Sequence, residues 1–231
     1  MDSNEPATTD EGRHTGPFGR EIDVVRARRV RISNLSFAYQ SARVFEDFGL
    51  DAQGRIFVLR GPSGCGKTTL LKLCAGVLER GEGIIEPLFE RPVLILQEDA
   101  LFPWLTGEQN ILRIAKVTPE DLRNSPLYSR IEGFVKQRAC QMSFGQRRII
   151  EITRALLVKP DLLCLDEPLN FIDASSRSLI LSALLGSLQH LKETTLLVSS
   201  HYESDFNASG VTDLTFDGSL PVRKVSISHR S

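Results

Sequence analysis

The strongest constraint on the fold is a short apolar run that stops at a glycine-rich stretch and continues as a helical pattern. Residues 56–59 read as a buried strand, and GPSGCGKTT follows Arg60. The stretch fits G-x-x-x-x-G-K-[ST], in which glycines let backbone N–H groups surround phosphate oxygens and the following helix adds its positive end. We therefore predict a strand, a nucleotide-binding loop and a helix. The predicted nucleotide contacts are Gly61, Pro62, Ser63, Gly64, Cys65, Gly66, Lys67, Thr68 and Thr69.

Other apolar runs alternate with helical patterns along the chain. Strand patterns occur at residues 30–39, 94–96, 162–165 and 195–199. Apolar residues at helical spacing occur at residues 67–76, 145–158 and 175–190. Residues 107–141 are more polar and mostly helical in pattern. Strands that alternate with helices form a mainly parallel sheet covered on both faces, so the predicted fold class is α/β.

Composition limits the other possibilities. The 231 residues fit one domain, and 41% of them are apolar, which is enough to bury a core. A net charge of −1 and a pI of about 6.4 argue against nucleic-acid binding through a basic surface. No apolar run approaches the roughly 18 residues that span a bilayer, so a membrane connection would need a partner. Residues 1–28 are predicted to be a disordered tail, and residues 226–231 a short second tail. Four scattered cysteines suit reduced thiols in a cytosol.

Two carboxylates follow the apolar run at residues 162–165. Asp166 and Glu167 would lie at the carboxyl edge of the sheet, where open α/β sheets bind ligands. We predict that Asp166 and the Thr68 hydroxyl hold Mg²⁺. Lys67 would reach the β- and γ-phosphates, and Glu167 would act as general base on the attacking water. An Asp-Glu pair is also common in solvent-facing turns, so this interpretation depends on Lys67.

The run Ser143-Phe144-Gly145-Gln146 lies one helix ahead of these carboxylates. With the phosphate loop and Asp166-Glu167, it makes the chain resemble the ATP-binding-cassette (ABC) ATPases over residues 30 to about 216. The resemblance implies a P-loop NTPase fold with an antiparallel β portion near the N-terminus. It also implies one nucleotide-binding domain at residues 29–225, with a helical subdomain at about 98–145.

The resemblance implies roles for further residues. The family's signature motif contacts the γ-phosphate held by an opposite subunit, and here Ser143, Gly145 and Gln146 match it. Ser143 could instead be only a helix cap. Phe144 replaces the family's first glycine: a positive φ there would be strained, and an ordinary φ would let its ring meet the partner subunit.

Other matches to the family lie at strand ends and at the interface between cassettes. Gln97 would sense Mg²⁺ and the attacking water, His201 would contact the γ-phosphate, and Asp173 would cross to the second cassette. Tyr39 would stack on adenine, with Phe37 as the competing candidate. The cofactors implied are ATP and Mg²⁺, and the catalytic residues implied are Lys67, Gln97, Glu167 and His201.

Residues 97–106, here called the Q-loop segment, are similar to the same segment of importer ATPases for nitrate, sulfonates and taurine. A membrane permease would be contacted near Phe102, Pro103, Trp104 and Thr106, although Trp104 could instead pack the helical subdomain. The implied protein is a peripheral ATPase subunit on the cytoplasmic face of the membrane, powering import of a small solute. A homodimer or heterodimer with a second cassette completes its sites.

Two alternatives stay open at the level of sequence. Residues 170–173 (NFID) look more like the ABC-F translation factors, which suggests a soluble ATPase that acts on the ribosome or another protein partner. A module that uses ATP only to hold a dimer together is the second alternative, and Glu167 and His201 argue against it.

Overall fold

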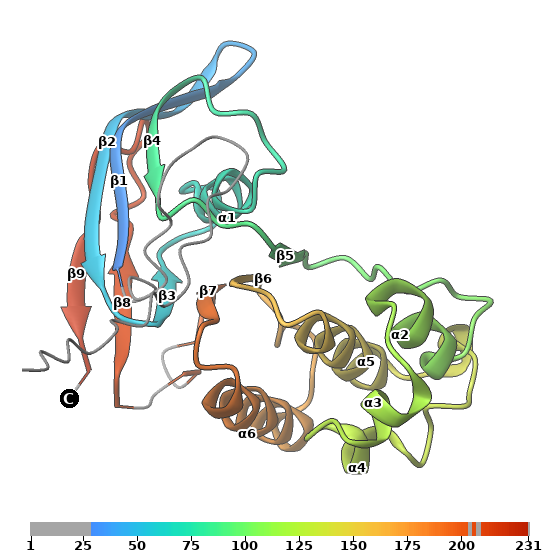
Figure 1. The fold of residues 1–231 in the computed structure, drawn as a ribbon. Helices are drawn as coiled ribbons and strands as arrows, with labels where there is room; N and C mark the ends of the chain where they lie inside the picture. The colour runs from blue at the N-terminus through green and yellow to red at the C-terminus, as the bar shows by residue number, and fades with distance from the viewer. Residues whose placement is uncertain (1–28, 203–204, 207–208, 231) are drawn as a thin grey trace, which may run out of the picture.

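A six-stranded sheet organises the fold (Figure 1). The computed structural model describes residues 29–202, 205–206 and 209–230. Strand β3 lies between β7 and β8 and is parallel to both, and the order across the sheet is β5-β6-β7-β3-β8-β9. The strands of this sheet are parallel, except that β9 runs antiparallel to β8. The strands are β3 (Ile56–Arg60), β5 (Pro92–Ile95), β6 (Leu162–Asp166), β7 (Thr195–Ser199), β8 (Val211–Thr215) and β9 (Ser226–His229).

Strand β6 shows how the sheet divides the apolar core. All five of its residues are buried. Leu162 and Cys164 belong to one core cluster, and Leu163 and Leu165 belong to the other. Because successive strand side chains point to opposite faces, the two clusters lie on the two faces of the sheet. A strand covered on both faces is typical of parallel α/β sheets, so this part of the prediction is confirmed.

A second, antiparallel sheet covers one of these clusters. Its order is β2-β1-β4, and the phenylalanines Phe45 and Phe48 of β2 pack with Leu70 and Leu71 of the first helix. This sheet is the antiparallel portion expected near the N-terminus. Its strands are β1 (Arg29–Tyr39), β2 (Ala42–Gln53) and β4 (Glu82–Glu86).

The helices fall into two groups (Figure 1). Helix α1 lies near the antiparallel sheet, whereas α5 and α6 lie together below the six-stranded sheet in this view. The short helices α2, α3 and α4 sit beside α5 as a helical subdomain, and α2 has the most extensive contact with α5. The helices are α1 (Lys67–Cys74), α2 (Gly107–Ala115), α3 (Pro119–Arg123), α4 (Tyr128–Ile131), the 3-10 helix Ala139–Gln141, α5 (Phe144–Leu157) and α6 (Ala174–His190).

One boundary prediction was wrong. Residues 226–229 were expected to be part of a tail, but they form β9. This strand pairs with β8, and His229 lies opposite Thr212. All four β9 side chains are exposed, so backbone hydrogen bonding defines this strand and the sequence lacks an apolar pattern. The predicted disordered tail, residues 1–28, lies outside the described residues. Within the described part of the chain, no helix is both long and apolar enough to cross a bilayer.

Candidate functional site

The phosphate loop connects β3 to α1. Gly61 has φ 139° and Gly66 has φ 99°, values that favour glycine. At Gly61 a Cβ atom would also lie 2.8 Å from the carbonyl oxygen of Phe216, so a side chain there would collide with backbone. The sequence thus folds into a turn that only glycine fits, and the loop ends where α1 begins at Lys67. A helix start and a turn with positive φ both point N–H groups at an anion.

Lys67 is folded over this loop. Its side chain is buried, and Nζ donates to the carbonyl oxygens of Gly61 and Pro62 at 2.9 Å each. The third neighbour of Nζ is the Cys65 Sγ atom at 3.8 Å, a weak acceptor. An ammonium group has three donors, so Lys67 can give one to a phosphate oxygen while the loop carbonyls hold the other two.

Asp166 joins the phosphate loop to the sheet. The Thr68 hydroxyl donates to Asp166 Oδ2 at 2.8 Å, and the Ser199 hydroxyl donates to Oδ1 at 2.7 Å. Asp166 of β6 and Ser199 of β7 are register partners in adjacent strands. A hydroxyl and a carboxylate side by side are hard oxygen ligands, which fit Mg²⁺. Ser199 was not predicted; its signal was its place at the end of a buried strand, two residues before His201.

Glu167 is held from three sides. His201 Nε2 contacts Oε1, and the Asn170 side-chain amide donates to Oε2. The Glu167 backbone N–H donates to the Ser199 hydroxyl at 2.8 Å, and its φ of 47° turns the residue away from the direction of β6. The structure therefore brings together Glu167 and His201, two of the predicted catalytic residues. Asn170 was not predicted as a site residue.

The signature motif begins α5 and has its own hydrogen bonds. Ser143 is the N-cap, and its hydroxyl accepts from the Gln146 N–H at 3.2 Å while Gln146 Oε1 accepts from the Ser143 N–H at 2.9 Å. The Ser143 hydroxyl hydrogen stays available to a further acceptor. A Cβ atom at Gly145 would meet only Ile172 and Ser176, at 3.8 and 3.9 Å, so packing within this chain does not require glycine there.

Phe144 occupies the first helical position of α5 and is not among the residues with positive φ. The strained conformation considered for it does not occur. Its ring lies edge-on to Phe171 at 6.3 Å between centroids and 5.4 Å from the guanidinium carbon of Arg148. Phe171 is itself 79% exposed with a φ of 61°.

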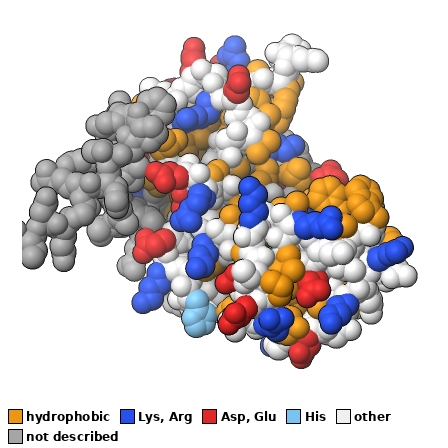
Figure 2. Space-filling model, turned by 45° about the vertical axis from the view of Figure 1, so that its right-hand side comes forward, with side chains coloured by type: hydrophobic (Ala, Val, Ile, Leu, Met, Phe, Trp, Pro, Cys, Tyr) orange, Lys and Arg blue, Asp and Glu red, His pale blue; other side chains and the backbone are white. Residues whose placement is uncertain are grey.

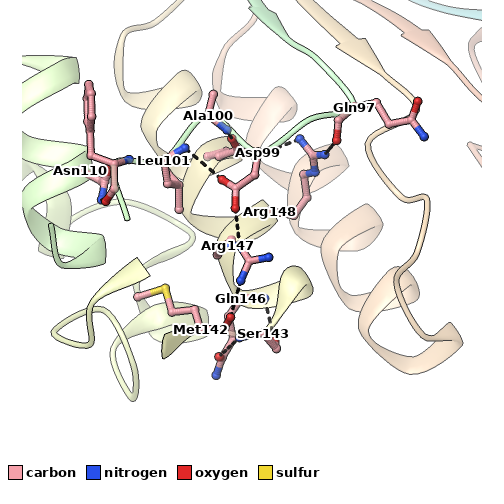
Figure 3. A network of polar contacts seen from close by, with 12 residues as sticks. Gln97, Asp99, Ala100, Leu101, Asn110, Met142, Ser143, Gln146, Arg147 and Arg148 are labelled. Atoms are coloured by element: carbon pink, nitrogen blue, oxygen red, sulfur yellow. Dashed lines mark hydrogen bonds and ion pairs between the residues drawn. The ribbon is translucent and has the colours of Figure 1, made fainter. Parts of the chain in front are cut away.

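The remaining predicted residues are spread around this site. Tyr39 ends β1 and is 43% exposed, with its ring edge-on to the half-buried Phe37 at 4.9 Å. The Gln97 carbonyl accepts from Arg148, and the Gln97 side chain extends away from that contact (Figure 3). Asp173 is the N-cap of α6 and accepts from the Ser176 N–H at 3.0 Å.

The Q-loop segment exposes two aromatic rings. Trp104 is 67% exposed and Phe102 is 39% exposed, with 5.6 Å between ring centroids. The alternative in which Trp104 packs the helical subdomain is therefore wrong. Figure 2 shows one face of the molecule, on which hydrophobic side chains reach the surface in several places between Lys and Arg side chains.

Hydrogen bonds and ion pairs thus join the phosphate loop, Asp166, Glu167 and His201 at one sheet edge. The sequence model of the ABC transporter family matches residues 48–170, more than half of the chain. The chain belongs to the ABC transporter family. The resemblance inferred from the motifs is confirmed.

Three relatives of this chain are import ATP-binding proteins. The taurine import ATP-binding protein TauB of Escherichia coli O6:H1 is 35% identical over 192 residues, which are 75% of this chain and 74% of that protein. The aliphatic sulfonates import ATP-binding protein SsuB of Bacillus cereus is 35% identical over 175 residues, 70% of this chain and 69% of that protein. The Fe(3+) ions import ATP-binding protein FbpC of Fusobacterium nucleatum is 31% identical over 209 residues; the match covers 83% of this chain but only 56% of that relative.

Solved structures show the same fold. An ATP-binding cassette of an ABC transporter aligns with a TM-score of 0.74 at 18% identity, covering 88% of this chain and 92% of that one. The ATP-binding subunit of another ABC transporter aligns at 0.71 with 22% identity, covering 87% and 90%. The predicted P-loop fold is confirmed. Because the relatives above are import ATP-binding proteins, the ribosome-directed alternative is not favoured.

Proposed function

We propose that this chain is the ATP-hydrolysing subunit of an ABC importer for a small solute. The observation that carries the proposal is the placement of Glu167. Its carboxylate lies at the end of β6, held by His201 and Asn170, directly after the Asp166 that is bonded to Thr68 of the phosphate loop. A fixed carboxylate next to a phosphate-binding loop suits a general base for water attack.

The residues present fit ATP and Mg²⁺. The loop N–H groups and Lys67 bind the phosphates, while the exposed Tyr39 ring offers a stacking surface for adenine. Thr68 and Asp166, already 2.8 Å apart, would hold the metal, with the Gln97 amide as a further oxygen ligand. Held by Thr68 and Asp166, Mg²⁺ would supply positive charge that offsets the negative charge developing on the phosphate oxygens.

The chain's own residues then perform the reaction. Glu167 takes the proton of the attacking water, and Lys67 stabilises charge on the γ-phosphate oxygens. The Asn170 contact keeps the Glu167 carboxylate in one orientation, so little reorganisation is needed. With ATP bound, His201 Nε2 would donate to a γ-phosphate oxygen instead of contacting Glu167 Oε1, and Asn170 would keep its contact with Oε2.

A second cassette would complete the site. Ser143 and Gln146 bond to each other rather than to the phosphate loop. Ser143 is exposed, so its hydroxyl hydrogen and the N-terminus of α5 are available as anion-binding groups. We propose that they bind the γ-phosphate held by a second cassette, arranged head to tail, with Asp173 at the shared interface. We propose that Trp104 and Phe102 contact a membrane permease at the cytoplasmic face of the membrane.

Phosphate release from ATP by the purified chain, with and without Mg²⁺, tests the proposal. We expect Mg²⁺-dependent release that disappears on Glu167→Gln, with formation of an ATP-bound dimer visible by light scattering. Absence of both ATP binding and release would refute it. For the partner, co-expression with a permease encoded beside the gene should give a complex whose yield falls for Trp104→Ala but not for the exposed Leu88→Ala, outside the Q-loop segment.

A further inference from the structure

A buried ion pair lies between the Q-loop segment and the signature helix. Arg148 and Glu151 are one turn apart on α5, with Nη1 to Oε2 at 2.8 Å, and each side chain is 1% exposed. Burial lowers the pKa of Arg148 and raises the pKa of Glu151, while the opposite charge of each partner acts against that effect. Removing both charges from water costs free energy, so the presence of this buried pair needs an explanation other than packing.

The pair is bonded to the main chain on either side of Gln97. Arg148 donates to the carbonyl oxygen of Gln97 at 2.7 Å (Figure 3). It also donates to the Leu96 carbonyl at 3.0 Å, and Glu151 accepts from the Ala100 N–H at 2.6 Å. These residues lie outside any helix or strand, so their polar groups have no ladder to join. Two side chains of α5 therefore fix the path of the backbone that carries Gln97.

A second pair of charged residues also connects α5 to the Q-loop segment. Arg147, also on α5, forms an ion pair with Asp99 and donates to the Met142 carbonyl. Asp99 in turn accepts from the Leu101 N–H at 3.0 Å. Figure 3 shows these side chains in one continuous chain from Leu101 to the start of α5.

On the far side, α2 holds the exposed part of the Q-loop segment. Asn110 is fully buried; its Oδ1 accepts from the Phe102 N–H at 2.8 Å, and its amide donates to the Phe102 carbonyl at 3.1 Å. Trp104 thus stands on a loop whose base is fixed to α2. Helix α2 in turn packs on α5.

Phe144 contacts the Arg148 end of the ion pair at the start of α5. Its ring centre lies 5.4 Å from the Arg148 guanidinium carbon, within the range of a cation–π contact. The residue at the family's first-glycine position therefore packs against the buried pair while forming the first turn behind Ser143. Movement of α5 at Arg148 must carry Ser143 with it, since both belong to the same helix end.

We propose that Arg148 and Glu151 are positioning residues that hold Gln97 and the signature helix as one rigid unit. A displacement of the exposed loop around Trp104 then reaches both Gln97 and Ser143 instead of being absorbed by the loop. This inference rests on the proposed function, because it gives the permease contact a route to both halves of the ATP site. The conformational link is reciprocal, so ATP bound at the site must also change the surroundings of Trp104.

Trp104 is the single tryptophan of the chain and reports on this link directly. The experiment measures acrylamide quenching of its fluorescence with and without ATP and Mg²⁺, in a Glu167→Gln background that keeps ATP bound. Equilibrium dialysis gives the dissociation constant for ATP, and phosphate release in the Glu167 form gives kcat and KM. Arg148→Lys removes the fork that reaches two carbonyls at once while keeping the charge.

Arg148→Lys is expected to lose most of the ATP-induced change in Trp104 quenching. We expect kcat to fall about tenfold or more because a small misplacement of site groups is costly, while ATP affinity stays within about twofold. Glu151→Gln keeps an oxygen acceptor for the Ala100 N–H and should therefore retain most of the response. Asp99→Ala, at a more exposed link, should weaken the response even if Arg148→Lys folds poorly.

Arg55→Lys is the matched control. Arg55 also donates to a main-chain carbonyl, that of Leu188 at 2.8 Å, but far along the chain from the Q-loop segment. It should leave the Trp104 response unchanged. The inference is overturned if Arg148→Lys and Asp99→Ala both show the full change in Trp104 quenching. It is also overturned if the parent binds ATP without any change in quenching. Either result leaves the proposed function intact. Failure of the parent to bind ATP overturns the proposed function as well.

Discussion

Asn110 offers a test of how firmly the Q-loop segment is held. Asn110→Ala would remove three hydrogen bonds of ordinary length, from the Phe102 N–H and to the carbonyl oxygens of Phe102 and Thr106, at 2.8, 3.1 and 3.0 Å. A hydrogen bond contributes about 1 kcal/mol net, so the loss of three costs about 3 kcal/mol. In a domain of this size that corresponds to a fall in Tm of about 6–12 °C.

Thermal unfolding followed by far-UV circular dichroism measures the loss, and Trp104 emission follows the loop in the same sample. Because the missing bonds anchor Phe102, we expect Trp104 emission to change below the global Tm. Arg113→Ala, an exposed position on the same helix, is the control and should change stability by less than about 0.5 kcal/mol. A loss below about 1 kcal/mol in Asn110→Ala would show that solvent replaces these bonds and that the loop is not anchored as described.

Further predictions concern the site itself. Glu167→Gln should lower kcat by about 10²–10⁴-fold with little change in ATP affinity; near wild-type phosphate release would remove its role as general base. Lys67→Ala should abolish ATP binding in equilibrium dialysis, and unchanged affinity would contradict the phosphate-loop assignment. Tyr39→Ala should weaken ATP binding by about 1 kcal/mol, or about fivefold, whereas equal affinity would leave adenine without this platform. Burial raises the pKa of Cys74 to about 12, so iodoacetamide at pH 8 should label the exposed Cys140 and spare Cys74 until urea unfolds the chain; mass spectrometry of peptides checks this order.

The sequence predicted the elements that carry the chemistry because their signals are local. The phosphate loop follows its strand directly, β6 and β7 are short continuous apolar runs, and α5 has apolar residues at helical spacing. Strands β2, β4, β8 and β9 were not predicted. β2 contains Asp47 with a positive φ, which interrupts its alternation, and β4 and β9 have mostly exposed side chains whose pairing is set by backbone contacts.

The side chains that support the site were harder to predict. Ser199 contacts Asp166 only because β6 and β7 lie side by side in register. Arg148 and Glu151 read as polar positions on a helix, and nothing in their spacing says that both are buried against the backbone near Gln97. Such contacts depend on where elements pack, which short-range patterns do not encode.

The positive φ of Glu167 lowers the stability of the fold at the same residue that is proposed to act as general base. A side chain in the left-handed region costs of order 1 kcal/mol or more, and glycine would avoid that cost. A library selected only for survival at high temperature should therefore accumulate Gly at this position and yield chains that bind ATP but do not turn it over. Selection for ATP hydrolysis would instead be expected to keep Glu at this position, so the residue found there would distinguish the two kinds of selection.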